Sequence, residues 1–258
     1  MDLELTGRNV LITGGSKGVG LSCARIFLAE GARVAIVSRS QAHLDAAAAS
    51  LGPVATFAAD LVDADAAGAM VERVEADFGP LDVLVNSAGA ARRSAVEDLT
   101  PAAWRAAMDA KYFSYINVID PVIKRMAARG RGVVVNVIGA GGKLASKVHI
   151  AGGSANAALM LATAGLANAY ASQGVRVVGV NPGPINTERA IEGLRVEAAR
   201  AGIGEDEARA RASASLGFGR FAEPDEIAGI VVFAASDAGR YLSGANIAVD
   251  GASVPTVV

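Results

Sequence analysis

The stretch that most constrains the fold covers residues 9–20 and reads NVLITGGSKGVG. It opens with an apolar run at residues 10–12, which is long enough for a buried strand of a parallel sheet. A glycine-rich turn follows, and then a helical pattern over residues 21–30. A strand, a glycine-rich turn and a helix N-terminus in this order bind phosphate through backbone N–H groups and the positive end of the helix dipole.

The glycines of this turn have distinct expected roles. Gly14 permits a tight turn, Gly18 allows the backbone to approach a pyrophosphate, and Gly20 allows the helix to pack closely on the strand. An ordinary β–α turn is the alternative, but the strand and the helix that the motif requires flank it on both sides. The stretch therefore predicts a dinucleotide-binding turn.

Apolar strand patterns alternate with helical patterns along the 258 residues. We expect strands at residues 10–12, 33–37, 54–58, 82–86, 132–138, 175–180 and 246–249. Helices are expected at residues 21–30, 41–50, 63–78, 101–128, 151–172 and 224–236, with Thr100 and Pro101 starting the fourth. This alternation predicts an α/β fold: one doubly wound domain over residues 1–258, with a seven-stranded parallel sheet and helices on both faces.

Composition excludes several function classes. A hydrophobic fraction of 52% and a charged fraction of 19% predict a sizeable core. The net charge of −2 gives no indication of a nucleic-acid or anionic-membrane partner. No apolar run reaches the roughly 18–20 residues of a membrane span, and the acidic N-terminus is unlike a signal peptide. One cysteine and two histidines argue against a metal site. We expect a cytoplasmic protein.

Two segments extend this outline. Residues 155–171 are apolar nearly all round, which fits either a core helix of a monomer or a helix that packs against a second subunit. The second interpretation predicts a homodimer or homotetramer. Residues 186–219 are rich in alanine and charge and are expected to form a helical insertion beyond a strand end, where lids over active sites lie.

The end of the second strand indicates which cofactor is bound. A carboxylate at this point would bind a free adenosine ribose, but the chain has Ser38, Arg39 and Ser40. Arg39 offers a planar guanidinium to a 2′-phosphate, and Lys17 adds a second charge. Solvated surface cations are the alternative. The pattern predicts NADP(H) rather than NAD(H).

Motifs along nearly the whole chain resemble those of the short-chain dehydrogenase/reductase family. The turn has the spacing TGxxxGxG, residues 86–89 read NSAG, residues 181–187 read NPGPINT, and residues 249–251 read VDG after Gly244. The resemblance implies a Rossmann-type fold and an oxidoreductase acting on a small molecule. It also implies cofactor contacts from Gly14, Ser16, Lys17, Gly18, Val19, Gly20, Arg39, Asp60, Leu61, Asn86, Ala88, Gly89, Ile138, Pro182, Gly183, Ile185 and Thr187.

The catalytic tetrad that the resemblance implies is substituted at every position. The family serine corresponds to Gly139, the tyrosine to Gly152, the lysine to Asn156 and the asparagine to Lys111. In the family, the tyrosine protonates the substrate oxygen and the lysine lowers the pKa of that tyrosine. No tyrosine lies between Tyr115 and Tyr170, so a shifted register does not restore the motif.

Two residues are candidates for the missing proton donor. The family fold implies that positions 111 and 156 face each other across the nicotinamide, so Lys111 is expected to polarise a substrate oxygen or to donate a proton. Burial would lower the pKa of such an ammonium toward neutrality. An ion pair with Asp109 or with a phosphate is the alternative. His149 is the second candidate because imidazole titrates near neutrality, although it also fits an exposed loop histidine.

Further cations surround the same segments. Lys143 and Lys147 lie in the loop before His149, and Arg92 and Arg93 follow the NSAG turn. Together they would suit an anionic substrate, such as a carboxylate or a CoA- or acyl-carrier-linked group, unless they form a solvated basic face. Residues 149–157 also resemble the matching segment of peroxisomal-type 2,4-dienoyl-CoA reductases. Those enzymes lack the tyrosine too, but they keep the lysine.

The sequence therefore predicts an NADP(H)-dependent oxidoreductase that transfers hydride to a carbonyl or an activated C=C bond, an acyl thioester among the candidates. Intact cofactor motifs beside a substituted tetrad also fit a different class of protein. In that interpretation the chain is a non-catalytic NADP(H)-binding sensor or an inactive partner subunit.

Overall fold

The computed structural model describes residues 2–89 and 96–254, in which seven parallel strands form one sheet of order β3-β2-β1-β4-β5-β6-β7. The strands are β1 (Asn9–Thr13), β2 (Arg33–Ser38), β3 (Val54–Ala58), β4 (Val83–Asn86), β5 (Gly132–Val137), β6 (Val175–Pro182) and β7 (Asn246–Val249). The order reverses between β1 and β4, and doubly wound sheets bind ligands at the carboxyl ends of strands beside such a point. The predicted fold class is confirmed.

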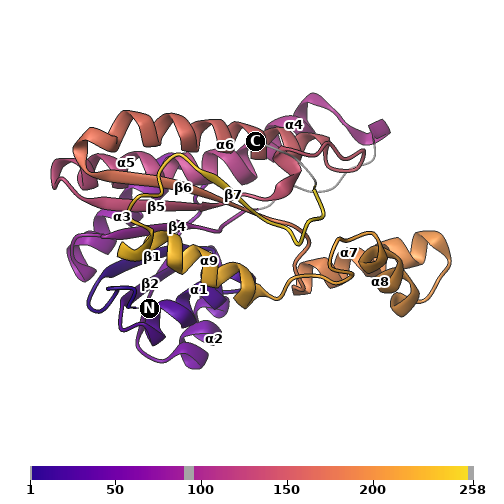
Figure 1. Ribbon diagram of the computed structural model, residues 1–258, viewed down its shortest axis with the longest axis horizontal. Helices are drawn as coiled ribbons and strands as arrows, with labels where there is room; N and C mark the ends of the chain where they lie inside the picture. Colours follow the sequence, from indigo (N-terminus) through magenta and orange to yellow (C-terminus); the bar gives the residue numbers. More distant parts are fainter. Residues whose placement is uncertain (1, 90–95, 255–258) are drawn as a thin grey trace.

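Helices cover both faces of this sheet (Figure 1). One layer contains α1 (Gly18–Ala29), α2 (Gln41–Leu51) and α9 (Pro224–Ala235), and the other contains α3 (Ala64–Phe78), α4 (Pro101–Met108), α5 (Ser114–Ala128) and α6 (Ile150–Tyr170). Alternate strand residues supply the two cores. In β1, Val10 and Ile12 join the core that includes α1 and α9, whereas Leu11 joins the core that includes α3 and α5.

The helix expected over residues 101–128 is interrupted. Thr100 caps α4 as predicted, because its Oγ1 accepts a hydrogen bond of 3.2 Å from the N–H of Ala103. The helix ends at Met108, and a π-helical turn at Asp109–Phe113 connects it to α5. The prediction of one continuous helix was wrong here because a π-turn widens the helix locally without changing the residue types that form it.

Helix α6 is more apolar than the sequence analysis allowed. Residues Ile150–Gln173 are long enough to cross a membrane, and their mean hydropathy of 1.3 is high enough. The sequence contains no uninterrupted apolar run of this length and therefore does not predict such a helix. The helix nevertheless packs on the sheet, where Leu159 and Thr163 are fully buried. Its outer face carries Leu161, which is 76% exposed. This helix covers the sheet on one side and presents apolar surface on the other.

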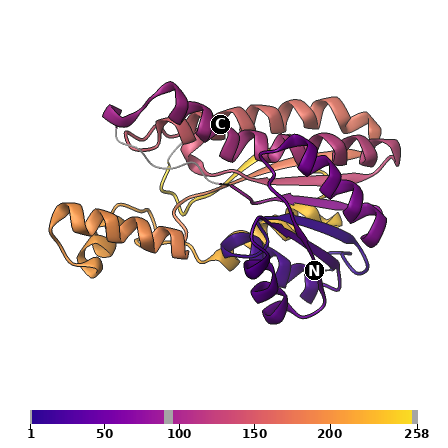
Figure 2. The same cartoon turned by 180° about the vertical axis from the view of Figure 1, so that it is seen from behind.

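Residues 186–219 form the predicted helical insertion. Helices α7 (Glu188–Ala201) and α8 (Glu205–Ala214) project together from the body of the molecule, as Figures 1 and 2 both show. The first residue of α7, Glu188, forms an ion pair with the glycine-rich turn, because its Oε2 lies 3.1 Å from Lys17 Nζ. The insertion therefore begins at the carboxyl edge of the sheet.

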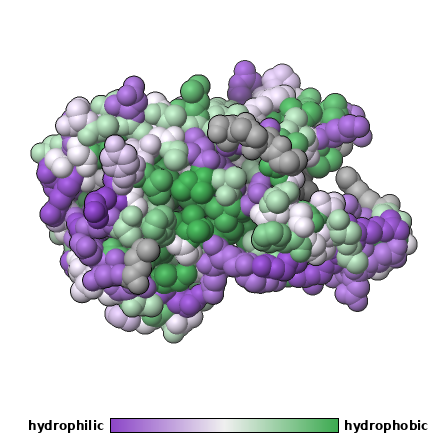
Figure 3. Space-filling view, in the orientation of Figure 1, coloured by the Kyte–Doolittle hydropathy of each residue, from purple (hydrophilic) through white to green (hydrophobic). Residues whose placement is uncertain are grey.

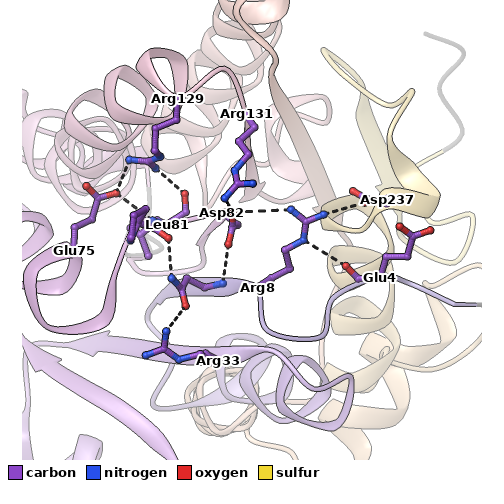
Figure 4. A network of polar contacts seen from close by, with 11 residues as sticks. Glu4, Arg8, Arg33, Glu75, Leu81, Asp82, Arg129, Arg131 and Asp237 are labelled. Atoms are coloured by element: carbon purple, nitrogen blue, oxygen red, sulfur yellow. Dashed lines mark hydrogen bonds and ion pairs between the residues drawn. The ribbon is translucent and has the colours of Figure 1, made fainter.

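The opposite edge of the sheet is held together by ion pairs (Figure 4). Asp82, just before β4, lies 3.4 Å from Arg131, which precedes β5, and 4.0 Å from Arg8, which precedes β1. Arg8 also pairs with Asp237 at 3.0 Å. These contacts connect the amino ends of neighbouring strands, on the edge remote from the glycine-rich turn.

Candidate functional site

The glycine-rich turn leaves β1 and lies against the turn that follows β4. Gly14 has a φ of +67°, and a side chain there would come within 2.8 Å of the backbone of Ser87 and Ala88. A Cβ on Gly20 would overlap the carbonyl oxygen of Gly14. Gly18, the first residue of α1, has a φ of +52°. Glycine is required at these three positions by backbone conformation or by close approach.

The N-terminus of α1 can accept an anion. Lys17 stands at its N-cap and makes no capping hydrogen bond with its side chain to the part of the chain that the structure describes. The first N–H groups of a helix have no intrahelical acceptor, and the helix dipole favours negative charge there. Ser16 is half-buried in the turn and Val19 is buried beneath it. The donors and the bare glycine backbone fit a dinucleotide pyrophosphate.

The turn after β4 packs directly on the π-helical turn. Gly89 has a φ of +76°, and a Cβ on it would overlap the carbonyl oxygen of Ala110. The hydroxyl of Thr13, at the end of β1, accepts hydrogen bonds from the N–H groups of Ser87 at 3.2 Å and Ala88 at 3.3 Å. The glycine-rich turn, the NSAG turn and the π-turn are thus fixed relative to one another.

A buried row of hydrogen bonds runs beneath these turns. Thr13 donates to Asn86 Oδ1 at 3.3 Å, and Asn86 Nδ2 donates to Asn136 Oδ1 at 3.0 Å. Asn136 Nδ2 in turn donates to Thr163 Oγ1 of α6 at 3.0 Å. The three strand residues occupy one register row across β1, β4 and β5. The row therefore aligns the carboxyl ends of these strands with α6.

The segment after β6 lies beside the glycine-rich turn. Pro182 ends β6, and a Cβ on Gly183 would come 3.1 Å from Asp250. Ile185 forms a bridge with Ala222, and Thr187 caps α7 by accepting a hydrogen bond from Ala190. A Cβ on Gly18 would lie 3.5 Å from the methyl group of Thr187. The two motifs thus come together in space.

The remaining expected cofactor contacts lie at the ends of β2, β3 and β5. Arg39 is exposed just after β2. Asp60 accepts a hydrogen bond of 3.1 Å from the N–H of Val62, and the neighbouring Leu61 is 5% exposed. Ile138, directly after β5, is also buried. All of these positions belong to the carboxyl edge of the sheet.

The structure places backbone, a ring and a buried amide at the positions where the resemblance implies tetrad residues. Gly139 has a φ of +124°, a conformation that a serine rarely adopts. A Cβ on Gly152 would overlap the imidazole of His149, so this ring fills the volume in which a tyrosine side chain would begin. Asn156 is buried, and its Nδ2 lies 3.3 Å from the position that a Cβ on Gly139 would occupy.

Lys111 is buried in the π-turn, with 7% of its surface exposed. Its Nζ donates to Tyr115 Oη at 2.8 Å and to the carbonyl oxygen of Val137 at 2.9 Å. Tyr115 Oη donates to the same carbonyl at 2.6 Å, and burial raises the pKa of this phenol well above its usual range. The ammonium is therefore held next to the end of β5, two residues before Gly139.

Sequence reasoning missed the part that Tyr115 plays as a partner of Lys111. Their spacing of four residues, within the helix expected over residues 101–128, could have indicated this contact. Among the expected cations, Lys143 is half-buried and Lys147 is exposed in the loop before α6. Arg92 and Arg93 lie outside the described residues.

Comparisons with known proteins agree with this geometry. A family profile described as short chain dehydrogenase matches residues 8–195. The chain is 33% identical over 257 residues to D-threitol dehydrogenase of Mycolicibacterium smegmatis, covering 97% of this chain and 94% of that enzyme. It is 34% identical over 248 residues to acetoacetyl-CoA reductase of Shinella zoogloeoides, covering 95% and 97%. The structure of L-sorbose reductase from Gluconobacter frateurii, complexed with NADPH and L-sorbose, superposes with a TM-score of 0.94 at 28% identity over 100% of both chains.

Proposed function

Because the chain belongs to the short-chain dehydrogenase family, we propose that it is an NADP(H)-dependent oxidoreductase with a non-standard active site. It transfers hydride to a carbonyl group or to an activated C=C bond, with residues 1–258 acting as one dinucleotide-binding domain. The observation that carries the proposal is the position of the dinucleotide cradle around Gly14, which shares the carboxyl edge of the sheet with the buried ammonium of Lys111. Polar and charged groups at this edge can act on a bound substrate.

NADPH would be held by groups that the structure brings to this edge. The turn from Gly14 to Gly20 and the N-terminus of α1 would bind the pyrophosphate, and Arg39 with Lys17 would bind the 2′-phosphate. When bound, this cofactor supplies the hydride. Two observations support NADP(H) over NAD(H): the end of β2 has no carboxylate, and the similar L-sorbose reductase was solved with NADPH.

Lys111 is the preferred group for acting on the substrate oxygen. Its charge is buried beside the end of β5, and a buried charge acts on a neighbouring atom far more strongly than one in water. The hydrogen bonds to Tyr115 and Val137 hold the ammonium in place. His149 is the second candidate for proton transfer, because its ring occupies the volume of the usual tyrosine.

A non-catalytic NADP(H)-binding sensor or inactive partner subunit is the second candidate function. The observation that favours it is the glycine at positions 139 and 152, which leaves none of the usual tetrad groups at the tetrad positions. The dinucleotide cradle would then serve binding alone.

The substrate and partners follow from the surroundings of the site. We propose a small-molecule substrate that is anionic or linked to CoA or an acyl carrier, because Lys143 and Lys147 lie in the loop before α6. An enoyl or dienoyl thioester is the second form of this substrate. We also propose a cytoplasmic homodimer or homotetramer. Figure 3 shows apolar side chains gathered over β7 and α9, at the open edge of the sheet, and α6 exposes Leu161.

NADPH consumption over a panel of ketoacyl thioesters, enoyl thioesters and keto sugars tests the proposal, with tyrosine-bearing family members as positive controls. The parent protein and Lys111→Met are assayed side by side, and NADPH binding is measured by fluorescence in the same samples. Turnover by the parent that falls in Lys111→Met supports an enzyme in which Lys111 acts. Tight NADPH binding without turnover of any substrate supports the sensor or partner-subunit function instead.

A further inference from the structure

The side-chain amide of Asn156, in α6, lies against the backbone of Gly139 and Gly141. The residue is 6% exposed, and its side chain makes no hydrogen bond within residues 2–89 and 96–254. Its Nδ2 lies 3.3 Å from the position that a Cβ on Gly139 would take. An amide without a protein partner has its N–H groups available to a hydrogen-bond acceptor that enters the site.

The His149 ring lies on the other side of the same loop. A methyl group added to Gly141 would be 3.6 Å from Asn156 Nδ2 and 3.7 Å from His149 Nε2. Both nitrogens therefore face one side of Gly141, which carries no side chain to separate them. A single acceptor atom placed just beyond this backbone is within reach of both.

Close backbone packing fixes this arrangement. A Cβ on Gly153 would approach the carbonyl oxygen of Gly141 to 2.7 Å, and one on Gly142 would approach the N of Ala157 to 2.8 Å. The loop at Ala140–Gly142 thus packs on the backbone of α6, in a way that larger residues would prevent. Gly139 and Gly152 are linked in space, because the loop, the His149 ring and the Asn156 amide pack against one another.

We propose that the Asn156 amide and the His149 imidazole form a binding site for the carbonyl oxygen of the substrate, replacing the serine and tyrosine of related enzymes. This inference rests on the proposed function and assigns the oxygen site within it. Nδ2 of asparagine is a donor, and Nε2 of histidine is a donor when it carries its hydrogen. The pair therefore selects a group that accepts two hydrogen bonds, which describes a ketone or thioester carbonyl and excludes an ammonium.

Binding without turnover tests this site directly. The probes are L-sorbose, acetoacetyl-CoA and crotonyl-CoA, each titrated by calorimetry into protein saturated with NADP⁺, which cannot reduce them. Asn156→Leu removes the amide at similar volume, and Asn156→Asp keeps the shape but replaces the donor with an acceptor. We expect the affinity for the probe to fall at least about tenfold in both variants, while the affinity for NADP⁺ stays close to the parent value. The thermal midpoint should stay close to the parent value in Asn156→Leu, whereas the buried carboxylate of Asn156→Asp should lower it.

A second variant blocks the site and leaves both donors in place. Gly141→Ala inserts a methyl group between Asn156 Nδ2 and His149 Nε2, where its nearest neighbour would be His149 Cδ2 at 3.2 Å. Gly141→Ala should lower the affinity for the probe as strongly as the Asn156 variants do. Gly68→Ala in α3 is the matched control, because a Cβ there meets nothing within 4 Å.

The outcomes separate the two proposals. A parent protein that does not bind NADP(H) overturns the proposed function. NADP⁺ binding with probe affinity unchanged in the Asn156 and Gly141 variants overturns the oxygen site alone, as does a parent that binds NADP⁺ but none of the three probes.

Discussion

The ammonium of Lys111 donates a hydrogen bond of 2.8 Å to the phenol oxygen of Tyr115, and the carbonyl oxygen of Val137 accepts from both groups. This carbonyl ends β5, so the strand that leads to Gly139 also fixes the position of the Lys111 ammonium. Lys111 Nζ lies 4.5 Å from the centre of the Tyr115 ring, which adds a favourable contact between cation and aromatic face. The position of the ammonium is thus determined by one residue of α5 and one residue of β5.

Replacing Lys111 with methionine tests whether this charge acts in catalysis. Methionine keeps much of the side-chain volume, and Tyr115 retains its hydrogen bond to Val137. A positioned proton donor is worth about 10²–10⁴ in rate, so kcat/KM should fall by that factor while the NADPH dissociation constant is unchanged. Steady-state kinetics and fluorescence titration measure the two quantities. Turnover at the parent rate would show that the lysine is structural.

Tyr115→Phe provides the matched control. It keeps the ammonium and its hydrogen bond to Val137 but removes the phenol oxygen. We expect the free energy of unfolding to drop by about 1–2 kcal/mol, because a buried hydrogen bond is lost. The rate should change much less than in Lys111→Met if the lysine charge is what matters.

Arg39→Ala tests the cofactor preference. Arg39 is exposed after β2, where it is available to a 2′-phosphate. Loss of a charge-assisted hydrogen bond should weaken NADPH binding by about tenfold or more and leave NADH binding unchanged. Fluorescence titration with both nucleotides measures this, and Arg105→Ala on α4 is the control for a general loss of surface charge. Equal affinities for NADPH and NADH in the parent would contradict the prediction.

The order of strands and helices could be predicted because each depends on local patterns. The apolar run of β1, the glycines that follow it and the cap at Thr100 are all visible within a few residues. The site depended on contacts between distant segments. Lys111 meets Val137, which lies 26 residues away, and the position of the His149 ring depends on how the loop packs on α6. Neither relationship leaves a periodic signal in the sequence.

Arg176 is expected to be a main stabilising residue away from the site. From β6, its guanidinium donates to the carbonyl oxygens of Ala234, Ala235, Ser236 and Leu242 at 2.9–3.3 Å. Burial lowers the pKa of this guanidinium, although Arg stays protonated at any accessible pH. Arg176→Met should lower the free energy of unfolding by about 2–3 kcal/mol, since several carbonyls at the end of α9 lose their donor.

Urea denaturation of Arg176→Met measures this loss, and Arg176→Lys should be intermediate because an ammonium cannot match the planar fork. Arg240→Met is the control, since Arg240 is exposed and donates one hydrogen bond of 3.3 Å to Asp237 O. Similar losses in Arg176→Met and Arg240→Met would contradict the assignment.

The Arg220–Glu226 pair predicts a specific dependence on pH. The hydrogen bond from Arg220, followed by that from the N–H of Glu223, lowers the pKa of Glu226 to about 2. A carboxyl whose pKa is lower in the folded state stabilises the fold above its unfolded pKa of about 4.3, and this contribution is lost as the pH falls toward about 2. The stability difference between the parent and Glu226→Gln should therefore be largest near neutral pH and shrink below about pH 4.

Urea denaturation at a series of pH values measures that difference. Both side chains are about half exposed, at 53% and 46%, so added salt should also reduce it. A difference that stays constant from neutral pH to about pH 3 would show that the substitution acts through the helix cap and not through the charge.

The outer face of α6 provides the last prediction, which concerns assembly. Leu161 is 76% exposed at the centre of a helix whose neighbouring residues are small, so a second copy of this chain could approach it closely. Burying one leucine contributes about 1.5–3 kcal/mol, and a symmetric interface repeats this gain in each subunit. Light scattering of the parent should give a dimer or tetramer, and Leu161→Lys should shift it to a smaller species without changing NADPH binding. Val196→Lys on α7 is the matched control, because Val196 is also exposed, at 58%, but lies on the projecting helices. A monomeric parent, or equal dissociation in both variants, would assign the apolar face of α6 to another role.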